Sequence, residues 1–339
     1  MSATAPSRAA PAEVHRTPSG TRDVLPDEMR ELRAIVERIR SAFDVAGYGE
    51  VHTPALEHEQ TFARAGAAGA LPAYRVLDEH GGALVLRPDV TVPIARLVAA
   101  RYPHAQPPLR FCYAEHVYRR VRPGRGEPRE LLQAGIELLG VPGAAGTAEA
   151  LRVLCAVLDA TGLREYRIGL GDATLHATLL DAFGVASHAR DRILAELAAG
   201  DFVGADREIH ALGLADGDAD LLLRVARTRG GPEILERQPP ALHDALAGLR
   251  ETHALLDPPA AQRLIFDLGL VRSLGYYTGA VFEVYDPGHG LPLGGGGRYD
   301  TLLGAFGRPM AAVGFALDVE RLHIALAGGR RGRMGEGDQ

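Results

Sequence analysis

The sequence predicts an α+β fold, in which helices flank an antiparallel sheet. Three observations predict it. Extended and helical segments are grouped along the chain rather than alternating, which argues against a doubly wound parallel sheet. Two long extended segments, 109–118 and 131–139, form a hairpin around a loop rich in Arg, Gly and Pro. An Ala- and Leu-rich helical stretch, 173–256, separates this hairpin from a second group of strands.

The first helix is expected after Asp27, a candidate N-cap, and is expected to end at Gly47. Its apolar residues recur at helical spacing and predict one buried face: Leu32, Ile35, Val36, Ile39 and Phe43. A short strand is expected at 51–56. After a loop that begins at Arg87, an apolar helix is expected near Pro93.

The remaining elements follow the same rules of periodicity and turn composition. A helix is expected at 147–159. Strands are expected at 166–170, 264–268, 281–285 and 312–317, and a closing helix at 319–327. The core is expected to span 17–327, with a mostly helical insertion at 173–256, a disordered lead-in at 1–16 and a disordered tail at 328–339.

Composition excludes several classes of function. The net charge of -6 argues against a dedicated nucleic-acid binder. All 37 basic residues are arginines, which excludes a Walker-type lysine, a pyridoxal Schiff base and a lysine nucleophile. Two cysteines fit a reducing cytosol, so we expect a cytoplasmic protein. No run is apolar for long enough to span a membrane. The scattered histidines predict no metal site, and no cofactor is expected.

Strand alternation provides the first candidate site. In the segment 131–139, Gln133, Gly135 and Glu137 share one face, and the glycine leaves room for a ligand. Glu115 and Arg119 share a face on the preceding strand. The alternative is a sheet face that is merely half-solvated.

A second candidate is the segment 270–279. Arg272 can bind a carboxylate in a bidentate manner, while Tyr276 and Tyr277 can flank a planar ring. The alternative is a tyrosine pair that packs on the core. The glycine run 294–297 favours a tight turn over a phosphate cradle, because no helix signal follows it. The arginine-dense loop 119–129 is expected to be solvated.

Taken in order, these segments resemble the motifs of class II histidyl-tRNA synthetases. The resemblance rests on Gly20–Pro26, Gly47–Glu57, Leu86–Thr91, Tyr118–Glu137, Leu270–Glu283, Gly296–Asp300 and Gly314–Arg321. It covers 17–327 and implies a class II synthetase-like sheet. It also implies a histidine pocket. Asp89, Thr91 and Gln133 would bind the amino group, Glu137 and Tyr277 the imidazole, Tyr276 the ring face, and Arg119 and Arg272 the carboxylate.

The departures from this family fall on its nucleotide side. Val121 and Glu127 stand where the synthetases have residues that contact ATP, and Asp318 replaces a glycine that leaves space for the nucleotide. Arg321 is retained. The chain also ends where a synthetase continues into an anticodon-binding domain.

A retained amino-acid pocket beside an altered nucleotide site resembles the regulatory subunits of ATP phosphoribosyltransferase. The resemblance implies no catalysis by this chain, a homodimer within a hetero-oligomer, a short catalytic subunit as partner, and L-histidine as feedback effector. Binding of tRNA is not expected. A truncated amino-acid-activating enzyme is the alternative, and a scaffold that senses uncharged tRNA is a weaker one.

Overall fold

The nine-stranded sheet is the centre of the fold. The structure is a computed structural model that describes residues 17–66, 72–121, 127–239, 242–271 and 276–335. The strand order is β1-β5-β6-β12-β11-β10-β7-β9-β8, and only the pairs β1/β5 and β7/β9 are parallel. The strands are β1 Gly49–Glu50, β5 Leu109–Tyr118, β6 Glu130–Leu139, β7 Arg167–Asp172, β8 Arg229–Gly230, β9 Leu264–Asp267, β10 Ala280–Asp286, β11 His289–Arg298 and β12 Ala312–Asp318.

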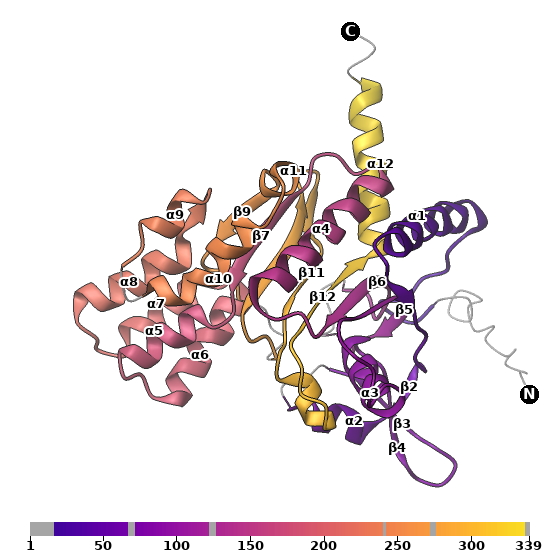
Figure 1. Ribbon diagram of the computed structural model, residues 1–339, viewed down its shortest axis with the longest axis horizontal. Coiled ribbons are helices and arrows are strands. Elements are labelled where there is room, and N and C mark those ends of the chain that lie inside the picture. The colour runs from indigo at the N-terminus through magenta and orange to yellow at the C-terminus, as the bar shows by residue number, and fades with distance from the viewer. Residues whose placement is uncertain (1–16, 67–71, 122–126, 240–241, 272–275, 336–339) are drawn as a thin grey trace, which may run out of the picture.

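Helices cover one face of this sheet (Figure 1). The alternation of each strand decides which side chains they bury: Ile136 of β6, Phe282 of β10 and Phe315 of β12 all lie in the core beneath these helices. The covering helices are α1 Pro26–Val45, α4 Gly143–Thr161, α10 His243–Ala254 and α12 Val319–Gly335, and the short α11 Pro258–Ala261 precedes β9.

A second, smaller core lies on the opposite face of the same strands. Phe111, Tyr113 and Leu131 project there from β5 and β6. This core also includes apolar residues from a small sheet of order β2-β4-β3 and from the elements around it. These are β2 Leu56–His58, α2 Glu59–Arg64, β3 Tyr74–Leu77, β4 Ala83–Leu86, α3 Thr91–Arg101 and the 3-10 helix η3 Leu302–Phe306. The second core leaves part of the sheet face uncovered, and the pocket lies there.

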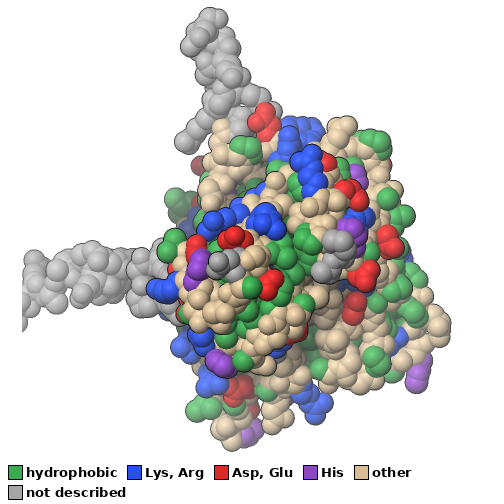
Figure 2. All heavy atoms as spheres, turned by 90° about the vertical axis from the view of Figure 1, so that its left-hand side faces the viewer, with side chains coloured by type: hydrophobic (Ala, Val, Ile, Leu, Met, Phe, Trp, Pro, Cys, Tyr) green, Lys and Arg blue, Asp and Glu red, His purple; other side chains and the backbone are tan. Residues whose placement is uncertain are grey.

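Most of the expected insertion, 173–256, folds as a helical module at one end of the sheet (Figure 1), whereas its last helix, α10, packs against α4 and β7. Its helices are α5 Leu175–Ala182, α6 Ser187–Ala199, α7 Phe202–His210, α8 Asp216–Arg227 and α9 Glu233–Glu236. Figure 2 shows charged side chains of both signs interspersed over this end of the molecule. That face therefore presents no single-sign field of the kind that binds nucleic acid.

Most of the expected elements are confirmed. The hairpin strands match β5 and β6, and all five residues of the predicted apolar face of α1 are buried. The expected N-cap is wrong: Leu25 occupies that position, because Pro26 begins the helix and Asp27 lies in its first turn.

One expected strand and one expected turn are also wrong. The segment expected at 51–56 is extended backbone between β1 and β2, and only its last residue, Leu56, pairs within a sheet. The glycine run 294–297 is not a turn. It lies in β11, where strands on both sides pair with it.

The chain ends depart from expectation in one respect. The closing helix α12 was expected to end at Ala327 and instead continues to Gly335, so 328–335 of the expected disordered tail is helical. Residues 1–16 and 336–339 lie outside the described residues. No helix among the described residues is long and apolar enough to cross a membrane.

Candidate functional site

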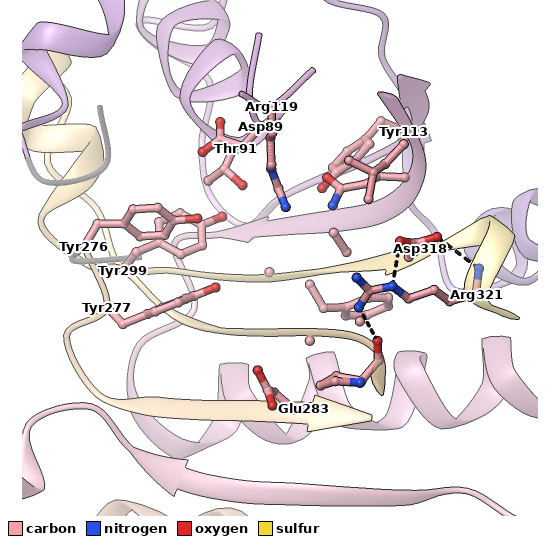
Figure 3. A pocket seen from close by; sticks show the side chains of 18 residues that line it. Asp89, Thr91, Tyr113, Arg119, Tyr276, Tyr277, Glu283, Tyr299, Asp318 and Arg321 are labelled. Carbon is pink, nitrogen blue, oxygen red and sulfur yellow. Dashed lines mark hydrogen bonds and ion pairs between the residues drawn. The ribbon is translucent and has the colours of Figure 1, made fainter. Parts of the chain in front are cut away.

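A pocket of about 220 Å³ opens on the sheet face that the α1–α4–α12 layer does not cover. Figure 3 shows its two ends: Asp89, Thr91, Tyr276 and Tyr299 lie at one, and Asp318 and Arg321 at the other, with Arg119 between them. The residues that line the pocket include Asp89, Thr91, Tyr113, Arg119, Gln133, Tyr276, Tyr277, Glu283, Pro292, Gly294, Gly295, Tyr299, Gly314, Asp318 and Arg321.

Asp89 is the pocket side chain that is best suited to bind a cationic group of a ligand. The residue is 5% exposed, and its Oδ1 accepts the backbone N–H of Val92 at 3.2 Å. Its Oδ2 is buried and has no hydrogen-bond partner among the described residues. Burial raises the pKa of this carboxyl to about 6, although nearby Arg119 opposes the shift. A buried carboxylate oxygen without a partner is costly, and a ligand cation would relieve that cost.

The loop that carries Asp89 is held by two arginines. Arg87, 2% exposed, donates from Nε to His116 O at 2.8 Å and pairs through Nη2 with Glu115 at 2.6 Å. Arg119 donates from Nε to Pro88 O at 2.9 Å. Both contacts join the loop to β5 or to the residue that follows it. The side chain of Asp89 is therefore positioned before any ligand arrives.

Glu137 lies behind the pocket wall rather than in it. It is 1% exposed and accepts the Thr91 hydroxyl at 2.7 Å. The Tyr299 hydroxyl donates to its other oxygen. Burial is the main reason why the pKa of Glu137 is well above its usual value, while the Thr91 hydrogen bond opposes the shift. Thr91 and Tyr299 both line the pocket, so Glu137 fixes two of its walls.

Three tyrosine rings line the pocket at its Asp89 end (Figure 3). The rings of Tyr276 and Tyr277 are 4.8 Å apart at 46°, and those of Tyr276 and Tyr299 are 5.7 Å apart at 87°. These tilted and edge-on contacts are the favoured aromatic geometries. The tyrosine pair therefore packs on itself and lines the pocket at the same time, and its binding of a planar ring stays a prediction.

The glycine run supplies the pocket floor. Gly294 and Gly295 of β11 line the pocket together with Gly314 of β12. A Cβ at Gly314 would lie 2.1 Å from Glu137 Oε2 and 2.4 Å from Ile136 O. Only glycine permits this close packing of strands beneath the ligand space.

The far end of the pocket is closed by an internal ion pair. Asp318 lies opposite Gln133 in the β12/β6 register. Its Oδ2 lies 3.2 Å from Arg321 Nε, and its Oδ1 accepts the Arg321 backbone N–H at 3.0 Å. Arg321 Nη1 also donates to Pro292 O at 2.8 Å. Both side chains are thus engaged with the protein.

The structure brings together most of the residues that the sequence proposed. The lining includes Asp89, Thr91, Arg119, Gln133, Tyr276, Tyr277, Asp318 and Arg321, while Arg272 lies outside the described residues. Val121 and Glu127 were expected on the nucleotide side, but neither lines the pocket, and Glu127 is exposed. They flank residues 122–126, which are not described.

Sequence reasoning missed several pocket residues. Tyr113 and Glu283 line it, and Tyr299 both lines it and binds Glu137. Alternation supplied a signal for Tyr113, because it shares a face with Glu115 on the same strand. No group of three or more metal-ligating side chains occurs among the described residues.

Glu320 lies beside the closed end of the pocket and predicts a pH effect on stability. Burial and neighbouring Asp318 raise its pKa to about 7, and its carboxyl accepts the Leu132 N–H at 3.1 Å. Between about pH 4.5 and 7 the Glu320 carboxyl is protonated in the folded state and ionised in the unfolded state. The free energy of unfolding should therefore fall as pH rises through this range.

Glu320→Gln keeps an acceptor for Leu132 and removes the titration. We expect urea unfolding of this variant to show a smaller loss of stability between about pH 5 and 7.5 than the parent shows. Parallel pH profiles for the two proteins would contradict the assignment.

Comparison with known proteins was consistent across sequence and structure. The family model described as histidyl-tRNA synthetase matches residues 20–322. The ATP phosphoribosyltransferase regulatory subunit of Symbiobacterium thermophilum is 40% identical over 318 residues, covering 91% of this chain and 79% of that protein. The one from Moorella thermoacetica is 40% identical over 320 residues, covering 91% and 81%.

Solved structures agree with the sequence matches. An ATP phosphoribosyltransferase regulatory subunit/histidyl-tRNA synthetase from Bacillus halodurans superposes with a TM-score of 0.84 at 34% identity, covering 92% of this chain and 83% of that one. A histidyl-tRNA synthetase from Nostoc, at 21% identity and a TM-score of 0.75 over 92% and 75% of the two chains, shares the fold. The chain, with its class II synthetase-like sheet, therefore belongs to the ATP phosphoribosyltransferase regulatory subunits of the histidyl-tRNA synthetase-like family.

Proposed function

We propose that this chain performs no chemistry of its own, that a separate short catalytic subunit of ATP phosphoribosyltransferase depends on it for activity, and that it carries feedback by L-histidine. The observation that supports the feedback role best is the buried Asp89 Oδ2, which has no partner among the described residues and faces a tyrosine-lined pocket. The names of the relatives support the regulatory role.

The side chains of the pocket match histidine group by group. Asp89, Thr91 and Gln133 would bind the ammonium group, and Arg119 with Arg272 would bind the carboxylate. Tyr276 would pack against the face of the imidazole, and Tyr277 and Glu137 would read its ring nitrogens. Glu137 lies behind Thr91 and Tyr299, so it would act on the ring through them. A histidine bound here would favour an inactive assembly, and the state of the catalytic subunit would in turn alter histidine affinity.

The test is an activity assay with a co-expressed short catalytic subunit. Product formation should require this chain and should fall when histidine is added. Asp89→Asn should keep the stimulation and lose most of the histidine inhibition, whereas Asp78→Asn, in an exposed turn between β3 and β4, should keep both. A catalytic subunit that is equally active without this chain would reject the main proposal.

A second candidate is an amino-acid-activating enzyme, because Arg119 and Arg321 remain in the pocket. A structure described as a histidine–tRNA ligase subunit from Alicyclobacillus acidocaldarius is 34% identical to this chain. We expect no histidine-dependent pyrophosphate exchange, since Asp318 already holds Arg321. Exchange above background in the purified protein would favour the enzyme instead.

The proposed assembly is a homodimer within a hetero-oligomer in the cytoplasm. Dimerisation is proposed through the segment Gly47–Glu57, as the synthetase resemblance implies. Light scattering of the purified chain should give twice the monomer mass. Binding of tRNA is not proposed, and a gel shift that weakens with salt would contradict that part.

A further inference from the structure

We propose that Asp318 makes the pocket selective for a ligand with a free carboxylate. It would exclude analogues of that ligand in which a phosphate replaces the carboxylate. The inference rests on the proposed histidine site and defines what that site rejects. It concerns the end of the pocket that lies beyond Arg119 in Figure 3.

The polar groups of the pocket are arranged along a line. Asp89, at one end, can take a cationic group, and Arg119, in the middle, can take an anionic one. A ligand whose ammonium group lies at Asp89 and whose carboxylate lies at Arg119 does not reach the Asp318 end of the pocket. Any group attached beyond the carboxylate position must enter the space bordered by Asp318 and Arg321.

The charge of Arg321 is already offset within the protein. Asp318 contacts both its Nε and its backbone N–H, at 3.2 and 3.0 Å, and Pro292 O accepts from its Nη1 at 2.8 Å. Asp318 is only 6% exposed, so water screens its negative charge weakly. This end of the pocket therefore has no unpaired positive charge to offer from Arg321.

A carboxylate and a phosphate monoester place different demands on that end. A carboxylate carries one negative charge, and a guanidinium can bind it in a bidentate manner. A phosphate monoester carries about -1.5 to -2 at pH 7 and has three strong acceptor oxygens. Its additional charge and oxygens would extend toward Asp318, whose like charge opposes them, while Arg321 is already paired. The pocket should therefore bind a free amino acid in preference to phosphorylated molecules that carry the same imidazole and amine.

The test compares two probes by calorimetry on the full-length chain. L-histidine carries the carboxylate, and L-histidinol phosphate keeps the imidazole and the amine but carries a phosphate ester. The parent protein should prefer histidine by on the order of 100-fold. Asp318→Asn keeps an acceptor for the Arg321 N–H but loses the charge. It should bind the phosphate probe at least about tenfold more tightly than the parent does, with histidine affinity changed by less than about threefold.

Two control variants separate this role from general charge effects and from misfolding. Asp191→Asn removes the same charge from exposed α6 and should leave both affinities unchanged. Arg321→Gln leaves Asp318 negative and should not improve binding of the phosphate probe. Retained histidine binding by Asp318→Asn shows that the pocket is folded.

Three results would overturn the inference in distinguishable ways. Equal affinity of the parent for the two probes would show that the pocket has no such selectivity. No gain in phosphate binding by Asp318→Asn, with histidine binding retained, would show that Asp318 is not its cause. If the parent binds neither probe, the proposed histidine site fails first and this inference fails with it.

Discussion

Asp89→Asn should weaken histidine binding by on the order of 100-fold, the largest binding effect that we expect from a single substitution in this pocket. The carboxylate is buried, its Oδ2 is unsatisfied by the described residues, and its loop is fixed by Arg87 and Arg119. An asparagine keeps an acceptor for the Val92 N–H but offers no charge to an ammonium group. Isothermal titration calorimetry at pH 7.5 measures the change directly.

The pH dependence of binding provides a second test of the same residue. The Asp89 pKa is about 6 in the ligand-free protein, and binding of a cation needs the ionised form. Affinity should therefore fall as pH drops from about 7.5 to about 5. The imidazole of histidine titrates in the same range, so the comparison must be made between variants. The pH profile of Asp89→Asn should be flatter than that of the parent, and identical profiles would exclude Asp89 as the ammonium partner.

Gly296→Ala should lower the free energy of unfolding by about 3 kcal/mol. Gly296 lies in β11 opposite Phe315 of β12. A Cβ there would be 2.0 Å from Gly314 O and 2.7 Å from Phe315 Cα. Both atoms belong to backbone, so no side-chain rotation can relieve the clash, and the two central strands must separate. Urea unfolding followed by circular dichroism measures the loss.

Gly248→Ala is the matched control for that substitution. Gly248 lies within α10, and a Cβ there would meet nothing within 4 Å. Because alanine is the better helix former, this variant should be more stable by about 0.5–1 kcal/mol. A loss of stability in Gly296→Ala no larger than about 0.5 kcal/mol would show that β11 and β12 adapt easily. The close strand packing beneath the pocket would then not be required.

Periodicity in the sequence was sufficient for the long elements. The apolar spacing of α1 reports which side of that helix is buried, because its burial follows the helical period. The alternation of β6 reports which face of the sheet each side chain occupies, although residues 134–139 are buried on both faces. Periodicity failed for the segment 51–56 and for the short strands of the small sheet. The strands of the small sheet are three or four residues long, too short for a period to emerge, and their register is decided by pairing with other strands.

The sequence by itself determined which chemical groups the site contains. The chain has no lysine, and Asp89, Thr91, Gln133 and the tyrosine pair occur in an order that resembles histidine-binding synthetases. Only the tertiary structure decided what these residues do to one another. It turned the glycine run into the pocket floor, placed Glu137 behind Thr91 and Tyr299, and paired Asp318 with Arg321. Contacts of this kind join strands that are distant in sequence, and local spacing carries no information about such distances.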